Sequence, residues 1–162
     1  MSYTLSRQEN NSDGAFNVPA SGSLATEWGP APFNRRHRVQ ASFSSQAIKN
    51  VNAMVSLAAN TGTPYTITTG FDDNGDGIFN DRPADVGRGT RRMPGQFTLS
   101  ATLSYGIDVG KSRLSWTLNA MNLTNHDNYT GVSGVLTSPF FGQATAVQNP
   151  RKVDAGMSVS FK

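Results

Sequence analysis

The sequence has no cysteine, few charged residues and no long hydrophobic run. The absence of cysteine excludes disulfide frameworks and thiolate metal sites. Charged residues make up 15% of the chain, against about a quarter in an average soluble protein, so the surface is unusually short of charge. No apolar run approaches the roughly 20 residues of a membrane-spanning helix. The net charge of +3 is scattered along the chain, and we expect no nucleic-acid partner.

The clearest periodicity lies in residues 96–125. Apolar residues occupy every second position in residues 97–107 and again in residues 114–120, with Ser, Thr, Asn or Gly between them. This period of two predicts two strands, each with one apolar and one polar face. Residues 108–113, which include Gly110, predict the turn between them, so we expect a β-hairpin.

The polar positions of this hairpin carry no charge. Water-facing strands of soluble proteins usually include Lys, Arg or Glu, which discourage edge-to-edge association. Residues 96–107 and 114–125 have none of these. A face of Ser, Thr, Asn and Gly suits a water-filled interior, whereas the apolar face, with Tyr105 and Trp116 toward one end, suits lipid. Each half is also about ten to twelve residues long, near the length of a tilted membrane-spanning strand.

The same alternation predicts about six strands, and hence an all-β antiparallel meander. Further strands are expected near residues 3–5, 36–46, 51–60 with a continuation at 65–69, and 153–161. Long loops are expected at residues 7–33, 71–95 and 124–150, with short turns at 47–50 and 108–113. Alternating long and short connections are typical of outer-membrane barrels, so the predicted fold class is a partial transmembrane β-barrel with long outer loops and short periplasmic turns. A soluble β-sandwich with unequal loops is the alternative.

Five motifs follow one another along the chain. They are residues 29–38, 62–65, 72–83, 119–125 and the end of the closing strand, 159–162. Together they resemble the C-terminal end of a TonB-dependent receptor, in particular the Oar-like receptors with a carboxypeptidase-regulatory-like N-terminal domain. In this resemblance Phe161 is the near-terminal aromatic of the family's assembly signal, although Lys162 follows it.

The resemblance implies a whole protein with a signal peptide, a TonB-contacting segment, a plug domain and a 22-stranded barrel. Because residues 1–7 have no apolar signal core, we expect residues 1–162 to be the C-terminal part of such a barrel, with Met1 internal to a longer reading frame. The implied location is the cell outer membrane, and the implied function is uptake of a large substrate.

The implied partners are outer-membrane lipid and lipopolysaccharide, and the remaining strands and plug. TonB would be contacted only through segments outside this chain. The alternative function is a soluble extracellular β-sandwich or adhesin-like module, with or without bound calcium.

The loop at residues 72–77 is the main candidate for a ligand site. Asp72, Asn74 and Asp76 place oxygen atoms at alternate positions, with Gly allowing a tight bend, as in calcium loops. Pro83 stands where the twelfth, acidic residue of an EF-hand-like loop belongs. The other interpretation is therefore an Asx- and Gly-rich turn in water, and we assign no metal ligand.

Four arginines follow in the same loop: Arg82, Arg88, Arg91 and Arg92. They either contact lipopolysaccharide phosphates or an anionic substrate through charge-assisted hydrogen bonds, or form a solvated basic loop. The two histidines, His37 and His126, lie in different segments, and no Ser-His-Asp order, nucleophile elbow or metal-binding His pair occurs. We therefore assign no catalytic and no cofactor-binding residue, and we expect no enzyme.

Overall fold

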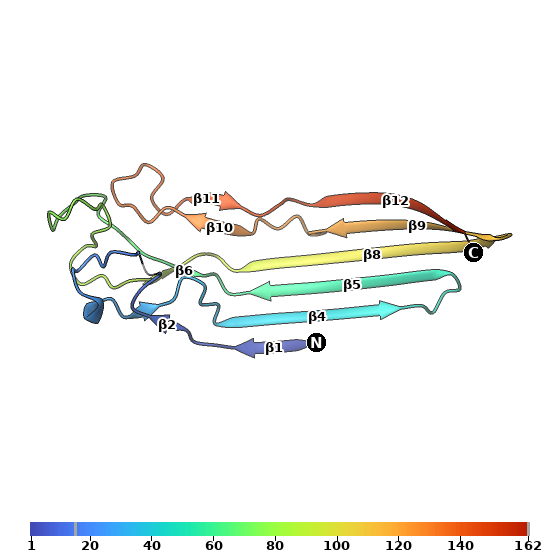
Figure 1. Ribbon diagram of the computed structural model, residues 1–162, viewed down its shortest axis with the longest axis horizontal. Helices are drawn as coiled ribbons and strands as arrows, with labels where there is room; N and C mark the ends of the chain where they lie inside the picture. Colours follow the sequence, from blue (N-terminus) through green and yellow to red (C-terminus); the bar gives the residue numbers. More distant parts are fainter. Residues whose placement is uncertain (15, 162) are drawn as a thin grey trace.

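The computed structural model describes residues 1–14 and 16–161, and its centre is one antiparallel sheet of six strands (Figure 1). The strands are β1 (Ser2–Leu5), β4 (His37–Ser45), β5 (Val51–Asn60), β8 (Gln96–Val109), β9 (Ser112–Met121) and β12 (Lys152–Phe161). Each pairs with the next of these strands along the chain, in the order β1-β4-β5-β8-β9-β12. The expected all-β antiparallel meander of six strands is confirmed.

The connections between these strands are short at one end of the sheet and long at the other. Two tight connections, residues 46–50 and 110–111, lie at one end of the sheet, which we call the tight-turn end (Figure 1). The three long connections, residues 6–36, 61–95 and 122–151, gather at the opposite end, the loop end. The chain thus shows the predicted alternation of short and long connections.

The β8–β9 hairpin is tighter than the sequence predicts. Its strands continue to Val109 and Ser112, which are paired, so the turn is two residues long and does not span residues 108–113. The side chains of Asp108 and Arg113 face each other across the hairpin at 3.4 Å, which favours the longer ladder. Gly110 has a φ of 60°, a left-handed conformation that Gly adopts without steric cost.

Two predicted strand ends are wrong. β9 stops at Met121, not residue 125, because Asn122 and Asn125 adopt φ values of 50° and 52° that a strand does not accommodate. The expected continuation at residues 65–69 does not join the main sheet. Instead β6 (Pro64–Tyr65) pairs with β7 (Arg91–Arg92) within the loop end.

The long loops hold short ribbons rather than unstructured chain. β2 (Glu9–Asn10) pairs with β3 (Gly29–Pro30), and β10 (Tyr129–Val132) pairs with β11 (Ala144–Val147). A 3₁₀ turn, η1 (Leu24–Thr26), begins after Ser23, whose side chain accepts a hydrogen bond from the Ala25 N–H. Across residues 1–14 and 16–161, no helix is long and apolar enough to cross a membrane.

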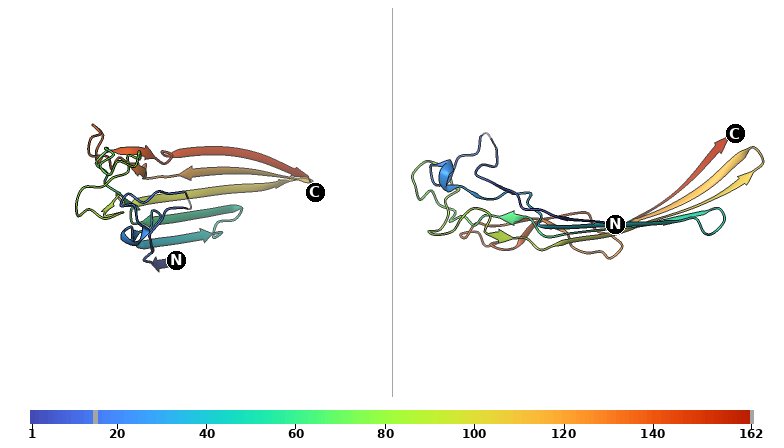
Figure 2. Two further views of the ribbon diagram at one scale, coloured as in Figure 1. Left: turned by 60° about the vertical axis from the view of Figure 1, so that its left-hand side comes forward. Right: turned by 90° about the horizontal axis from the view of Figure 1, so that it is seen from below.

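The main sheet is bent and twisted, and no second sheet is stacked on it within the described residues (Figure 2). In the same part of the chain, only Ala31 and Ile67 are buried apolar residues, and both belong to the loop end. The described part of the chain therefore has no hydrophobic core between two layers, and the two faces of the sheet remain open.

Candidate functional site

Unbroken strand register places most apolar residues of the six strands on one face of the sheet, with Met54, Ala58 and Met121 on the other. Leu57 is opposite Leu99, and Leu103 is opposite Leu118. The face, here called the apolar face, comprises Tyr3 and Leu5, Val39, Ala41 and Phe43, Val51, Ala53, Val55, Leu57 and Ala59, Phe97, Leu99, Ala101, Leu103, Tyr105, Ile107 and Val109, Leu114, Trp116, Leu118 and Ala120, and Val153, Ala155, Met157, Val159 and Phe161.

Large side chains of this apolar face are open to the surroundings. Phe43 is 70% exposed and Met157 is 66% exposed. Leu103, in the middle of the longest strand, is 47% exposed. Because a contiguous apolar surface of this extent is unusual on a soluble monomer, the face requires an apolar environment or a covering partner.

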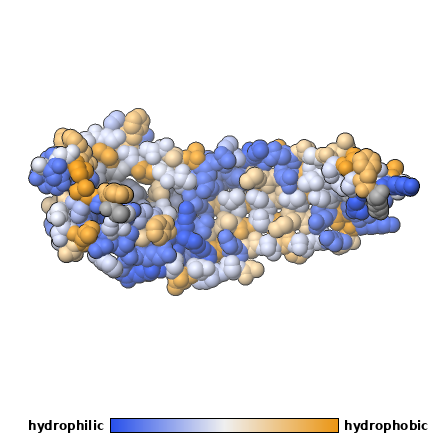
Figure 3. Space-filling model, viewed as in Figure 1, coloured by the Kyte–Doolittle hydropathy of each residue, from blue (hydrophilic) through white to orange (hydrophobic). Residues whose placement is uncertain are grey.

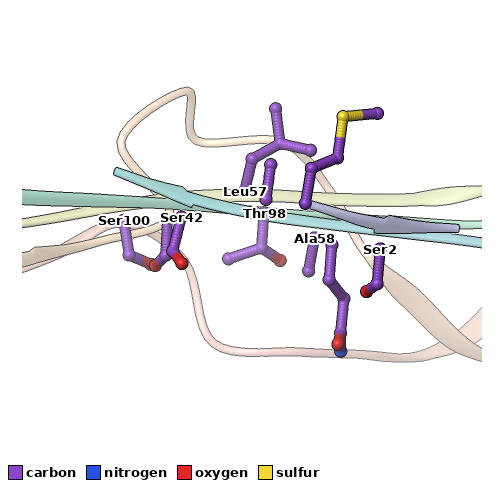
Figure 4. A pocket seen from close by; sticks show the side chains of 10 residues that line it. Ser2, Ser42, Leu57, Ala58, Thr98 and Ser100 are labelled. Atoms are coloured by element: carbon purple, nitrogen blue, oxygen red, sulfur yellow. The ribbon is translucent and has the colours of Figure 1, made fainter. Parts of the chain in front are cut away.

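The opposite face, here called the polar face, carries mainly small uncharged side chains. In the close view, Leu57 points to one side of the sheet, whereas Ser42, Thr98 and Ser100 point to the other (Figure 4). The side chain of Thr102 donates to Asn119 across β8 and β9 at 3.0 Å, and the hydroxyls of Ser104 and Thr117 are 3.4 Å apart. These cross-strand pairs stabilise the sheet without introducing charge.

A shallow depression of about 490 Å³ opens where β1, β4, β5 and β8 meet. Its polar lining comes from Ser2, Gln40, Ser56 and Ser100 among others (Figure 4). On the face that Figure 3 presents, hydrophobic residues gather over the two ends of the molecule, and mostly pale or blue residues cover the strands between them. Met1, Ala41, Leu57 and Ala58 also line it, and none of the lining side chains is charged.

A buried ion pair joins the first and second long loops at the loop end. Arg82 donates two hydrogen bonds to the Glu27 carboxylate, at 2.7 and 2.8 Å, and Ser21 donates to the same carboxylate from its N–H and its hydroxyl. The hydrogen bonds from Arg82, and to a lesser extent those from Ser21, lower the pKa of Glu27 to about 2, although burial opposes the shift. Glu27 is only 3% exposed. The pair therefore holds two loops together as one body.

Arg88 strengthens the same junction. Its guanidinium is buried and donates to the backbone carbonyl of Glu27 at 3.1 Å, to the Asp13 carboxylate and to both oxygens of Asn10. Both interpretations offered for the arginine loop are thus wrong for Arg82 and Arg88. These side chains are internal ties between loops rather than solvated charges or contacts to an outside anion.

The acidic loop forms the turn that the sequence offers as its second interpretation. The Asp72 carboxylate accepts hydrogen bonds from the N–H groups of Gly75, Asp76 and Gly77, all between 2.8 and 3.0 Å. Asp81, which is 5% exposed, accepts from two further N–H groups of the loop. Within the described residues, no three His, Asp or Glu side chains are grouped so as to hold a metal ion.

Asn128 fixes the third long loop to the start of β8, and Asn122 closes a turn within that loop. The side chain of Asn128 accepts from the Phe97 N–H at 2.7 Å and donates to the Phe97 carbonyl at 2.9 Å, as a paired strand residue would. Asn122 accepts from the His126 N–H and donates to its carbonyl. Both asparagines are buried, so these bonds are shielded from water.

The two histidines remain apart, as expected. Nδ1 of His37, on β4, is 2.8 Å from the hydroxyl of Tyr3 on β1, and Nδ1 of His126 is 3.2 Å from Oδ1 of Asn128. Each therefore has a local hydrogen-bond role that differs from the other, and the pair forms no joint site.

No family model, curated protein or solved structure matches this chain. The function is therefore inferred from the two faces of the sheet and from the loop end. Sequence patterns missed Glu27, Asp13 and Asn128, which act through partners far along the chain. The one available signal for Asn128 was an asparagine directly before a short strand, and that signal is common to many turns.

Proposed function

We propose that this chain forms six adjacent strands in the wall of an outer-membrane transporter of the TonB-dependent receptor type. The observation that carries the proposal is the strand register, which gathers most apolar residues on one open face and mainly small uncharged residues on the other. The apolar face then contacts acyl chains, and the polar face lines the hydrated interior of the barrel. A lipid-facing band opposite a polar interior is the pattern of membrane barrels.

Strand length and connection length support the same proposal. β4, β5, β9 and β12 have 9 or 10 residues, and β8 has 14. A tilted strand needs about 9–11 residues to cross the hydrocarbon layer. The tight turns then face the periplasm and the folded loop end faces outward.

Aromatic side chains support the same orientation at the tight-turn end. Tyr105 and Trp116 stack on the apolar face with ring centroids 5.8 Å apart. Amphipathic rings of this kind prefer the boundary between acyl chains and head groups. The pair lies two positions from Leu103 toward the tight turns, and therefore marks the half of the sheet that is nearer to the periplasmic head groups.

The edges of the sheet indicate what else the assembly contains. β1 and β12 each pair with one neighbour in the described residues, so each presents one free row of backbone groups. An unsatisfied backbone group in lipid costs several kcal/mol, so in the proposed assembly the remaining strands of the barrel pair with both edges. Outer-membrane lipid, lipopolysaccharide and a plug domain are the further proposed partners, and TonB acts on other segments of the receptor.

A soluble β-sandwich or adhesin-like module is less well supported. In a sandwich, the apolar face of each sheet is packed against the other sheet, about 10 Å away. Here the large side chains of the apolar face are exposed, and the described residues supply no second layer over them.

The two tryptophans provide a direct test of the proposed orientation. Trp116 lies on the apolar face, whereas Trp28 lies at the loop end. The chain is folded into vesicles whose lipids carry bromine on their acyl chains, and tryptophan fluorescence is measured. We expect strong quenching of Trp116 in the Trp28→Phe variant and weak quenching of Trp28 in the Trp116→Phe variant, because bromine quenches only on contact.

Vesicles of the same lipids without bromine are the control. Equal quenching of both tryptophans, or a folded monomer in buffer without detergent or lipid, contradicts a membrane-spanning sheet and favours the soluble module.

A further inference from the structure

The acidic loop, residues 72–77, contains the one place in the sequence where asparagine is followed by glycine, Asn74 and Gly75. Asparagine loses its side-chain amide most readily before glycine, because glycine has no side chain to hinder attack by its backbone nitrogen. Asn74 is exposed to solvent. The pair is therefore a candidate site of spontaneous chemical modification.

The modification, deamidation, needs no enzyme and no cofactor. The backbone nitrogen of Gly75 attacks Cγ of Asn74 and forms a C–N bond. The Cγ–Nδ2 bond breaks, and Nδ2 leaves as ammonia with the hydrogen that the Gly75 nitrogen gave up. Water then opens the cyclic imide at either of its two carbonyls, which leaves aspartate or isoaspartate at position 74. The first step thus requires the Gly75 nitrogen to release its hydrogen and the Asn74 amide to turn toward it.

The fold holds the attacking nitrogen in a hydrogen bond. The Gly75 N–H donates to Oδ1 of Asp72 at 2.8 Å, and the same carboxylate accepts from the N–H groups of Asp76 and Gly77. A carboxylate at this position retains the hydrogen and disfavours the negative charge that the nitrogen must carry before it attacks. Asp72 therefore opposes the first step of deamidation.

The Asn74 side chain is held as well. Its Nδ2 donates to the Ala20 carbonyl at 3.1 Å and to the Asp76 carboxylate at 3.2 Å. Its Oδ1 accepts from the Asp76 N–H at 2.9 Å. These three bonds fix the amide group and oppose its rotation. The bond to Ala20 also connects the second long loop to the first.

We propose that Asn74 is a deamidation site that the folded acidic loop protects, and that its reaction releases one tie between the first and second long loops. Aspartate and isoaspartate have no side-chain donor when ionised, so the bond to the Ala20 carbonyl is lost. The new negative charge also lies beside the Asp76 carboxylate, to which the amide donated. The inference uses only contacts at the loop end, and it holds whether or not the sheet spans a membrane.

The protection is tested by incubating the full chain at mildly alkaline pH, both in the detergent or buffer in which it folds and unfolded in guanidinium chloride. Mass spectrometry of the peptide that contains position 74 follows the conversion, because deamidation changes the mass whereas isomerisation of Asp76 does not. We expect conversion at least about tenfold slower in the folded chain, since a charge-assisted hydrogen bond must first break. Equal rates overturn the proposal.

Two variants with the same change of charge test the role of Asp72. Asp72→Ala removes the acceptor of the Gly75 N–H, and we expect about tenfold faster conversion in the folded chain. Asp73→Ala is the matched control, because the Asp73 carboxylate accepts from the Thr69 hydroxyl and not from Gly75. It should change the rate less than about twofold. Equal acceleration by both variants overturns the proposal. If Asp72→Ala does not fold, the comparison of folded and unfolded chains decides alone.

The effect on the loops is tested with Asn74→Asp, which carries the side chain of one product. The Gly22 N–H donates to the Pro19 carbonyl at 3.0 Å, in the turn that contains Ala20. We expect hydrogen exchange of the Gly22 amide to be several-fold faster in this variant. Asn52→Asp, which adds the same charge on β5, should leave it unchanged. Unchanged exchange in Asn74→Asp overturns the proposed release of the loops.

Discussion

Glu27 shows how a single side chain controls the loop end. It is nearly inaccessible to water, yet it stays ionised because Arg82 and Ser21 saturate its oxygen atoms. Removing one member of a buried pair leaves the other charge without compensation, which is far more costly than losing an exposed pair. The junction between the first two long loops therefore depends on the protonation of this one carboxyl group.

The free energy of unfolding of the loop end should fall at acidic pH because of Glu27. Its pKa in the folded chain is about 2, below the ordinary 4.5, so its ionised form stabilises the fold above about pH 4.5. That contribution, roughly 3 kcal/mol, is lost as the pH falls from about 4.5 to about 2. The loss of this stability is measured by hydrogen exchange of the Ser21 amide, after correction for the intrinsic pH dependence of exchange.

Glu27→Gln should weaken the junction at neutral pH and remove this pH dependence. Glu9→Gln is the matched control, since Glu9 pairs with the exposed Arg7 and should leave exchange at Ser21 unchanged. The same acid response in the Glu27→Gln chain would show that another group is responsible.

The residue pairs of the loop end were not predictable from local pattern. Arg82 is 55 positions from Glu27, and Arg88 is 75 from Asp13. Sequence periodicity relates only residues that are two to four positions apart. The four arginines could therefore be described only as a basic loop. The Asp72 turn was predictable, because Asx residues bond to N–H groups a few positions on.

At the scale of elements, the strands were predictable because alternation is a local property. Leu99, Leu103 and their neighbours repeat every second residue, and this period also fixes which face each side chain takes. Strand ends were less predictable. Asn122 leaves the strand conformation because its side chain bonds to His126, a contact that depends on the folded loop. The short ribbons pair through tertiary contacts and have too few residues to show a period.

Close backbone approach at Gly134 holds the second and third long loops together. A Cβ atom there would lie 2.0 Å from the Thr66 carbonyl oxygen. The Thr68 N–H donates to the Gly134 carbonyl, and the Leu136 N–H donates to the Thr68 carbonyl, at 3.0 and 2.9 Å. Any side chain at position 134 must therefore push the two loops apart.

Gly134→Ala should destabilise this contact by about 1–3 kcal/mol, the usual cost of overpacking. Faster hydrogen exchange at the Thr68 and Leu136 amides, with a lower urea midpoint, measures it. Gly156→Ala is the matched control, because a Cβ atom on that β12 residue meets no atom within 4 Å. Equal behaviour of the two variants would show that the loops separate without cost.

At the scale of the whole molecule, the main sheet has two faces of different polarity. Its largest apolar side chains are exposed on one face, while Thr102 and Asn119 pair on the other. Buried apolar residues lie only in the loop end of the described chain, so the sheet does not gain stability by covering its own apolar surface. In water this surface is costly, at about 25 cal/mol per Å² of apolar area. In the proposed barrel, lipid on the apolar face removes that cost.

Adjacent residues in the middle of β8 allow the two faces to be compared at one depth. Leu103 lies on the apolar face and Ser104 on the polar face, one position apart at the same depth of the sheet. In the proposed barrel, Leu103→Arg should cost about 2–4 kcal/mol, since an Arg facing lipid near the bilayer centre is destabilising. Ser104→Arg places the same charge in the hydrated interior and should change stability far less.

Urea unfolding of both variants in lipid vesicles, monitored by tryptophan fluorescence, compares the two costs. If water covers both faces, Leu103→Arg should be tolerated as well as Ser104→Arg, because Leu103 is 47% exposed and no described layer packs on it. A large difference between neighbours on one strand therefore requires an apolar medium on one side of the sheet, and equal tolerance contradicts it.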